Sequence, residues 1–260
     1  MIFMSKLQKP LSAHGSLWSL FLMILFLMAV TACGAAPPIL PTTATVDETF
    51  SEENEGDLVL PEGVASFDKN FLIVFDNSGS MAESECGGKD LQPVEESLGN
   101  RRVDVAKWAT TKFVQESVPA DVNVGFYPLN KSEWRVPFGK DNREHILAAI
   151  ANMGAGGGTP LNRALKEGTD LLKAQRARQL GYGEYYIVVV TDGEPSDGDD
   201  MKGAEYAVNN NVSVVTIGFC LGEKHALNKY SVSSHNVADP SELFRALRDT
   251  QAELKEYDFK

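Results

Sequence analysis

The chain has 260 residues, of which 43% are hydrophobic and 23% charged, which is typical of a folded protein with one sizeable domain rather than a disordered chain. Its 36 acidic residues outnumber its 24 basic residues, giving a formal net charge of −12 at pH 7. Because such a surface repels phosphate groups, we expect no nucleic-acid partner.

Residues 1–32 have the pattern of an export signal. Lys6 and Lys9 supply a positive start, and residues 20–30 form an apolar run that is too short to span a bilayer as a mature helix. Cys33 follows a few small residues, at the place where the lipobox of bacterial lipoproteins carries its modified cysteine. This resemblance implies a lipid anchor on Cys33. A plain secretory signal and an uncleaved anchor are the alternatives.

Residues 33–66 are predicted to be a flexible tether, because they are rich in proline, threonine and acidic residues and contribute little to a core. Alternatively, residues 58–60 pack on the domain as an edge strand. Gly34, rather than an aspartate, follows the lipobox cysteine. In the lipoprotein pattern this favours the outer membrane if the cell is Gram-negative; otherwise the expected location is the outer face of the cell membrane.

From residue 67 to residue 260 the sequence predicts a single domain that begins with strand signals. Continuous apolar or alternating runs predict four strands, over residues 71–75, 122–127, 185–190 and 212–219. Residues 134–138 are expected to form only a short edge strand, because Pro137 has no N–H to donate to a central ladder.

Helix signals lie between and after these strands. Residues 101–118, 143–153, 160–179 and 201–209 are predicted helices, and a last helix begins at Pro240 with Asp239 as its cap. This alternation predicts an α/β fold with a doubly wound, mostly parallel sheet flanked by helices, as in Rossmann-like domains. In such sheets, ligands bind at the carboxyl ends of the strands, near the topological switch point.

Three segments at that edge carry oxygen-bearing side chains. Asp76, Ser78 and Ser80 follow the first buried strand, Thr159 follows three glycines, and Asp192 follows the strand over residues 185–190. Two carboxylates and three hydroxyls, without thiol or imidazole, suit a hard cation such as Mg²⁺. The glycines permit close approach of the threonine loop.

Together these segments resemble the metal-ion-dependent adhesion site of von Willebrand factor A domains. Asp76, Ser78 and Ser80 match its D-x-S-x-S motif, and Thr159 and Asp192 match its threonine and distal aspartate. The resemblance implies that both serines and, in the bound state, the threonine ligate the ion directly, whereas both aspartates act mostly through water. It implies Mg²⁺, with Mn²⁺ or Ca²⁺ as alternatives. It also implies a protein ligand whose Asp or Glu carboxylate completes the coordination shell.

The motifs support an enzymatic function less well than a binding function. Gly158 is followed by Thr159 and Pro160 rather than by the lysine of a phosphate-binding loop, and no serine lies in a G-x-S-x-G motif. His145, His225 and His235 lack the spacing of a zinc-binding helix. We therefore expect a non-enzyme, although an open metal position leaves hydrolysis as a third alternative.

Cys86 and Cys220 are the remaining cysteines after Cys33. Because an exported protein meets oxidising conditions, they are expected to form a disulfide, with two free thiols as the alternative. The expected function is therefore that of a membrane-anchored adhesion module that captures a protein ligand through its metal. The second alternative is a structural or assembly subunit that recruits envelope or secretion-machinery partners.

Overall fold

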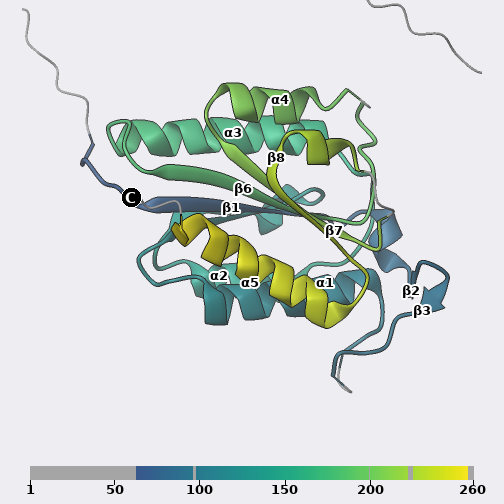
Figure 1. Ribbon diagram of the computed structural model, residues 1–260. Helices are drawn as coiled ribbons and strands as arrows, with labels where there is room; N and C mark the ends of the chain where they lie inside the picture. Colours follow the sequence, from purple (N-terminus) through teal and green to yellow (C-terminus); the bar gives the residue numbers. More distant parts are fainter. Residues whose placement is uncertain (1–62, 96–97, 199, 222–224, 257–260) are drawn as a thin grey trace, which may run out of the picture. The chain divides into compact units, whose positions relative to one another are not determined.

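The computed structural model describes residues 63–95, 98–198, 200–221 and 225–256 (Figure 1). The predicted signal, Cys33 and residues 58–60 lie outside these ranges. Among the described residues, no helix is long and apolar enough to cross a membrane. The last residues of the predicted tether contact the domain, since the Val64 N–H donates to the Arg178 carbonyl oxygen at 3.1 Å.

A six-stranded sheet with the strand order β5-β4-β1-β6-β7-β8 forms the centre of the domain. All neighbouring strands pair in parallel except β5, which is antiparallel to β4 at one edge. The strands are β1 (Lys69–Phe75), β4 (Asn123–Pro128), β5 (Val136–Gly139), β6 (Glu184–Thr191), β7 (Ser213–Phe219) and β8 (Ser231–Val237). The predicted mostly parallel α/β sheet is confirmed, as is the edge strand that contains Pro137.

Helices cover both faces of this sheet (Figure 1). One face carries α1 (Arg102–Lys112), α2 (Arg143–Asn152) and α5 (Pro240–Glu256), and the other carries α3 (Leu161–Arg178) and α4 (Lys202–Asn209). Successive side chains of β1 enter opposite cores: Phe71 and Ile73 pack under α1, whereas Leu72 packs under α3. Burial on both faces explains why the central strands are apolar without alternation.

The chain reverses its direction of progress across the sheet between β1 and β6. From β1 the chain continues through α1 to β4 on one side, and from β6 it continues through α4 to β7 on the other. The two helices therefore leave the neighbouring carboxyl ends of β1 and β6 in opposite directions. This arrangement makes the β1–β6 edge the switch point of the sheet, where such folds bind their ligands.

Three features differ from the sequence prediction. β8 was not expected, because its sequence SVSSHNV is polar and its side chains alternate between half-buried and exposed at the sheet edge. The segment after the first predicted metal loop contains a hairpin of β2 (Glu85–Cys86) and β3 (Lys89–Asp90). The predicted helix over residues 101–118 is α-helical only to Lys112 and ends in a π-helical turn, Phe113–Ser117. Single-turn 3₁₀ helices, Gly79–Ala82, Ser132–Trp134 and Ala226–Lys229, add to the loops.

Candidate metal site at the switch point

Asp76 is the first residue after β1 and is fully buried. Its backbone N–H donates to the Val190 carbonyl oxygen at 2.9 Å, which continues the β1–β6 ladder by one residue. Its carboxylate accepts hydrogen bonds from the Ser78 N–H at 2.8 Å and from the Thr191 hydroxyl at 2.6 Å. Burial raises the pKa of Asp76 above its ordinary value, the two donors oppose this shift, and the nearby Asp192 adds to it. A bound cation would offset the energetic cost of burying the ionised Asp76 carboxylate.

Ser78, Ser80 and Asp192 are joined by direct contacts. The two serine hydroxyl oxygens lie 3.0 Å apart, and the Ser80 hydroxyl donates to Asp192 Oδ1 at 2.8 Å. Ser80 belongs to the first loop and Asp192 to the loop after β6, 112 positions later in the chain. The fold therefore gathers the hydroxyls and the distal carboxylate of the predicted site at one point.

Thr159 reaches the same place from the loop before α3. A methyl group placed on Gly193 would lie 3.9 Å from both the Thr159 hydroxyl oxygen and the Ser80 hydroxyl oxygen. The two hydroxyls therefore flank one glycine next to Asp192. Thr159 is held there by Ser196, which accepts from the Thr159 N–H and donates its own N–H to the Thr159 carbonyl oxygen, both at 2.9 Å.

Two asparagines that the sequence analysis did not identify hold the first loop to the glycine loop. The buried Asn77 side chain accepts from the Asn130 N–H at 2.8 Å and donates to the Asn130 and Gly154 carbonyl oxygens. Asn130 in turn donates to the Gly158 carbonyl oxygen at 2.8 Å. Gly157 has φ +90°, and a side chain there would come within 2.5 Å of Asn130 Oδ1. Glycine is therefore required where these loops meet.

His225, which the sequence analysis considered only as a zinc ligand, supports the loop that carries Asp192. Its ring is buried, and its Nδ1 accepts from the Leu227 N–H at 3.1 Å. This contact leaves the proton on Nε2, which donates to the Gly193 carbonyl oxygen at 2.9 Å. Both ring nitrogens are thus used to fix backbone, so the histidine positions the loop.

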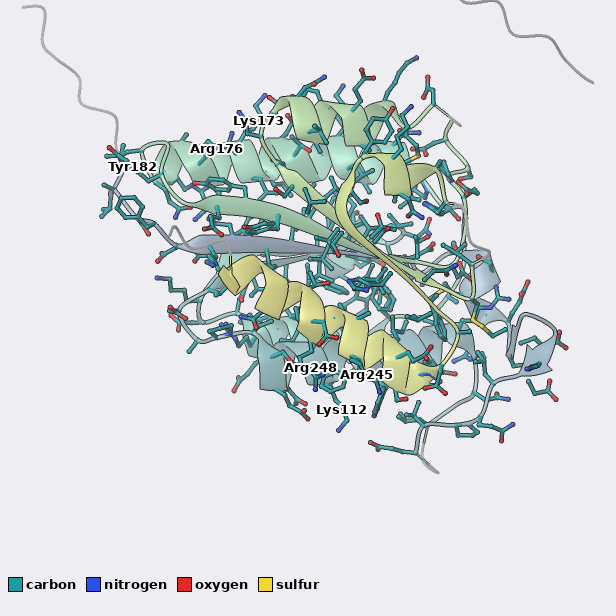
Figure 2. All side chains as sticks on the ribbon, in the orientation of Figure 1. Lys112, Lys173, Arg176, Tyr182, Arg245 and Arg248 are labelled. Carbon is teal, nitrogen blue, oxygen red and sulfur yellow. A yellow bond between two sulfur atoms is a disulfide. The ribbon has the colours of Figure 1, made fainter. Side chains whose placement is uncertain are left out.

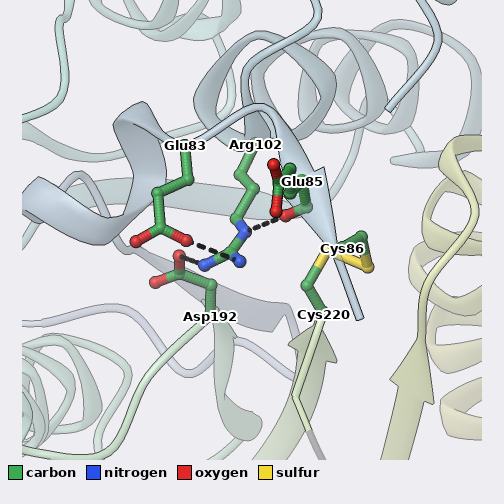
Figure 3. The surroundings of a disulfide bond; sticks show 6 residues. All are labelled: Glu83, Glu85, Cys86, Arg102, Asp192 and Cys220. Atoms are coloured by element: carbon green, nitrogen blue, oxygen red, sulfur yellow. Dashed lines mark hydrogen bonds and ion pairs between the residues drawn. A yellow bond between two sulfur atoms is a disulfide. The ribbon is translucent and has the colours of Figure 1, made fainter. Parts of the chain in front are cut away.

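Arg102, in the first turn of α1, connects the Asp192 loop to the segment that precedes the disulfide (Figure 3). Its guanidinium donates to Asp192 Oδ2 at 3.0 Å, to the Glu85 carbonyl oxygen at 2.8 Å, and pairs with Glu83 Oε2 at 2.7 Å. Cys86, next to Glu85, forms a disulfide with Cys220 at the end of β7. Nothing in the sequence pattern had indicated a role for the arginine.

The donor set fits a hard divalent cation. The converging groups are hydroxyl and carboxylate oxygens, which Mg²⁺ prefers, and two of the ligating candidates are neutral serines. Within the described ranges, no cluster of three or more His, Cys, Asp or Glu side chains offers an alternative metal site. The nearby Asp197 instead caps α3, accepting from the Asn162 and Arg163 N–H groups at 3.1 and 2.8 Å.

Comparison with known families agrees with this architecture. The von Willebrand factor type A domain matches residues 70–254, so the chain belongs to that family. At the general level, such a domain is a protein-interaction or adhesion module. The human inter-alpha-trypsin inhibitor heavy chain H4 is 28% identical over 172 residues, which are 62% of this chain and 16% of that protein. This chain therefore spans about a sixth of its curated relative.

Solved structures share the fold at low sequence identity. BatB from Bacteroides thetaiotaomicron is 16% identical, with a TM-score of 0.54, over 72% of this chain and 99% of that one. Proximal thread matrix protein 1 from the mussel byssus, solved with a zinc-occupied MIDAS motif, is also 16% identical, with a TM-score of 0.54, over 74% of this chain and 49% of that one. These structural similarities support the fold alone. Members of the von Willebrand factor A family commonly bind a divalent metal.

Proposed function

We propose that this protein is a lipid-anchored binding module that captures a protein ligand through a divalent ion, Mg²⁺ in the first instance. Ser78, Ser80 and Thr159 would hold the ion directly, with Asp76 and Asp192 behind them acting through water. The observation that carries the proposal is the Ser78–Ser80–Asp192 chain of contacts, with the Thr159 hydroxyl beside it.

The ion would supply an electrophilic position to a carboxylate of the partner. Neutral hydroxyls leave most of the charge of such an ion uncompensated, and they are rigidly placed because each loop is tied to its neighbour. Asn77 holds the first loop to the glycine loop, and Ser196 holds Thr159 to the segment after Asp192. The role of these residues is to present the ligands without reorganisation.

Binding without turnover is the second part of the proposal. The histidine that touches these loops, His225, uses both ring nitrogens on backbone groups, so it offers no free base to activate water. The hydroxyls of Ser78 and Ser80 contact each other and Asp192 rather than an imidazole. This pattern favours a receptor site over a nucleophilic one.

The placement of the site suits display away from a membrane. The chain enters the domain at the amino end of β1, near Val64, whereas the candidate site follows the carboxyl end of the same strand. A seven-residue strand separates these points by about 23 Å. With a lipid on Cys33 and a tether from Gly34 onward, the attachment point would lie at the opposite end of β1 from the metal edge, and the domain would be displayed on the outer membrane of a Gram-negative cell or on the outer face of the cell membrane otherwise.

Thermal unfolding with and without Mg²⁺ tests the metal part. A protein that begins at Gly34 keeps every described residue, and its cores are supplied by residues 71–247. Mg²⁺ is expected to raise the Tm of this protein and of a Ser84→Ala control, because an ion that binds only the folded state stabilises it. It should not raise the Tm of Ser78→Ala. An equal Mg²⁺ response in all three proteins would contradict the assignment.

The anchor and the partner need separate tests. Metabolic labelling with a fatty acid should label the full chain but not Cys33→Ser, and a labelled variant would refute the anchor. Crosslinking on intact cells should then give a protein adduct that depends on Mg²⁺ and is lost with EDTA and in Ser78→Ala. An adduct with an external protein supports adhesion, whereas one with a component of the envelope machinery supports an assembly role.

A further inference from the structure

Arg102 is a nearly buried cation at a place that disfavours positive charge. Its side chain is 13% exposed, and it lies in the first turn of α1, where the helix dipole is positive. A guanidinium stays charged at any physiological pH, so its burial must be compensated by anions. The compensation comes from Asp192, whose side chain is 0% exposed, and from Glu83, whose side chain is 59% exposed.

The guanidinium and the proposed metal ion share one carboxylate. Asp192 Oδ2 accepts from Arg102 at 3.0 Å, while Asp192 Oδ1 accepts from the Ser80 hydroxyl, one of the candidate ligands. A cation bound at the serines would therefore lie on the other side of the same aspartate. Because the Arg102 and Asp192 side chains are largely shielded from solvent, the two positive charges repel each other more strongly than they would in bulk water.

We propose that Arg102 is an internal cation that neutralises Asp192 when the site holds no ion and limits how tightly the site holds one. The inference rests on the proposed metal function and concerns a residue outside the five candidate ligands. Pairing with Arg102 keeps the Asp192 loop well ordered when no metal is bound. When the metal is bound, the guanidinium adds positive charge beside the ion, which favours an incoming carboxylate. Arg102 is thus a positioning residue that sets affinity.

Arg102 can affect Mg²⁺ affinity in two ways, by holding the loops in place and by its charge. Removing it should change the affinity in opposite directions in the two cases. If Arg102 only held the loops in place, its removal would weaken Mg²⁺ binding, as loss of outer-shell partners usually does by about 10- to 100-fold. If its charge dominates, removal strengthens Mg²⁺ binding. Charge should dominate in Arg102→Gln, because the glutamine amide nitrogen takes the place of the arginine Nε and can still donate to the Glu85 carbonyl oxygen, while the positive charge is gone.

The experiment is Mg²⁺ titration by calorimetry, together with thermal unfolding in EDTA, on the protein that begins at Gly34. Arg102→Gln is expected to bind Mg²⁺ about tenfold more tightly than the unsubstituted protein and to unfold at a lower temperature in EDTA. Arg248→Gln is the matched control for net charge. Arg248 lies on α5 and pairs with the neighbouring Asp249, both half-exposed (Figure 2). Arg248→Gln should leave both the Mg²⁺ affinity and the unfolding temperature in EDTA unchanged.

A second variant keeps the test valid if Arg102→Gln folds poorly. Glu83→Gln removes the exposed carboxylate that shares Arg102 and leaves the guanidinium less compensated, so Mg²⁺ binding should weaken by about threefold. Its control is Glu116→Gln, in the π-helical turn Phe113–Ser117 at the other end of the α1 segment, about 20 Å along the helix from Arg102. A control that weakened binding equally would mean that net charge alone acts.

The outcomes distinguish the two proposals. Tighter Mg²⁺ binding in Arg102→Gln supports the inference. If Arg102→Gln does not fold, weaker Mg²⁺ binding in Glu83→Gln with an unaffected control supports it, and unchanged binding in Glu83→Gln overturns it. Unchanged or weaker binding in Arg102→Gln, with normal binding in the unsubstituted protein, overturns the inference and leaves the proposed metal site intact. If neither protein binds Mg²⁺, the proposed function fails and the inference fails with it.

Discussion

Replacing Cys86 and Cys220 together with serine is expected to destabilise the domain substantially. The disulfide joins residues 134 positions apart, so it closes a loop that contains most of the domain. The chain-entropy relation for a loop of that length gives about 17 cal/mol/K, or about 5 kcal/mol at 25 °C. That is a large share of the roughly 5–15 kcal/mol by which a domain is stable. The double variant should therefore be marginally folded at 37 °C.

Guanidinium-induced unfolding measures this difference directly. The oxidised protein that begins at Gly34 should show a higher midpoint than the Cys86→Ser/Cys220→Ser variant. Dithiothreitol should lower the midpoint of the first protein to that of the variant and leave the variant unchanged. A difference in unfolding free energy below about 1 kcal/mol would refute the reasoning that this bridge constrains the unfolded chain.

Substitutions at three further residues test the scaffold of the domain. Gly203→Ala would place its methyl group 2.3 Å from the Asn162 carbonyl oxygen and push α4 from α3, costing about 1–3 kcal/mol in urea unfolding; no loss would contradict that packing. Asp239→Ala removes the cap of α5 and should cost about 1 kcal/mol, whereas Asp239→Asn should cost much less. Burial disfavours ionised Asp104, but hydrogen bonds from Arg101 outweigh it and lower the pKa of Asp104 below 3.8. The stabilisation of the folded domain by ionised Asp104 is therefore complete above pH 3.8 and is lost as the pH falls through the folded pKa. Asp104→Asn should be less stable than the unsubstituted protein at pH 7, and this difference should vanish in acid.

The sequence was sufficient for five of the six strands of the sheet and for the candidate ligands, because both depend on local patterns. The apolar strand before Asp76 and the one before Asp192 are buried on both faces, so each is a continuous hydrophobic run that ends at the switch point. Thr159 comes from the loop before α3, whereas the other motif residues lie within five positions of the ends of those strands, namely Asp76, Ser78, Ser80 and Asp192. Topology then requires that they meet, since parallel neighbours end at the same edge of a sheet.

What the sequence could not indicate depends on contacts between distant segments. Arg102 looks like an ordinary helix residue until folding places its guanidinium on Asp192, 90 positions away. Asn77 and Asn130 are common turn residues whose pairing across 53 positions has no local signature. β8 was missed because its side chains pack only at the sheet edge, with Val232 64% exposed, so hydrophobic periodicity is weak there.

We have proposed that Asp76 and its neighbours form a site for one hard divalent ion. Isothermal titration of Mg²⁺ into the protein that begins at Gly34, compared with Asp76→Ala, tests it most directly. We expect one ion per chain to bind the first protein and none to bind the variant, which should still be folded by circular dichroism. Equal Mg²⁺ binding by both proteins, or no binding by the first, would overturn the assignment of this site.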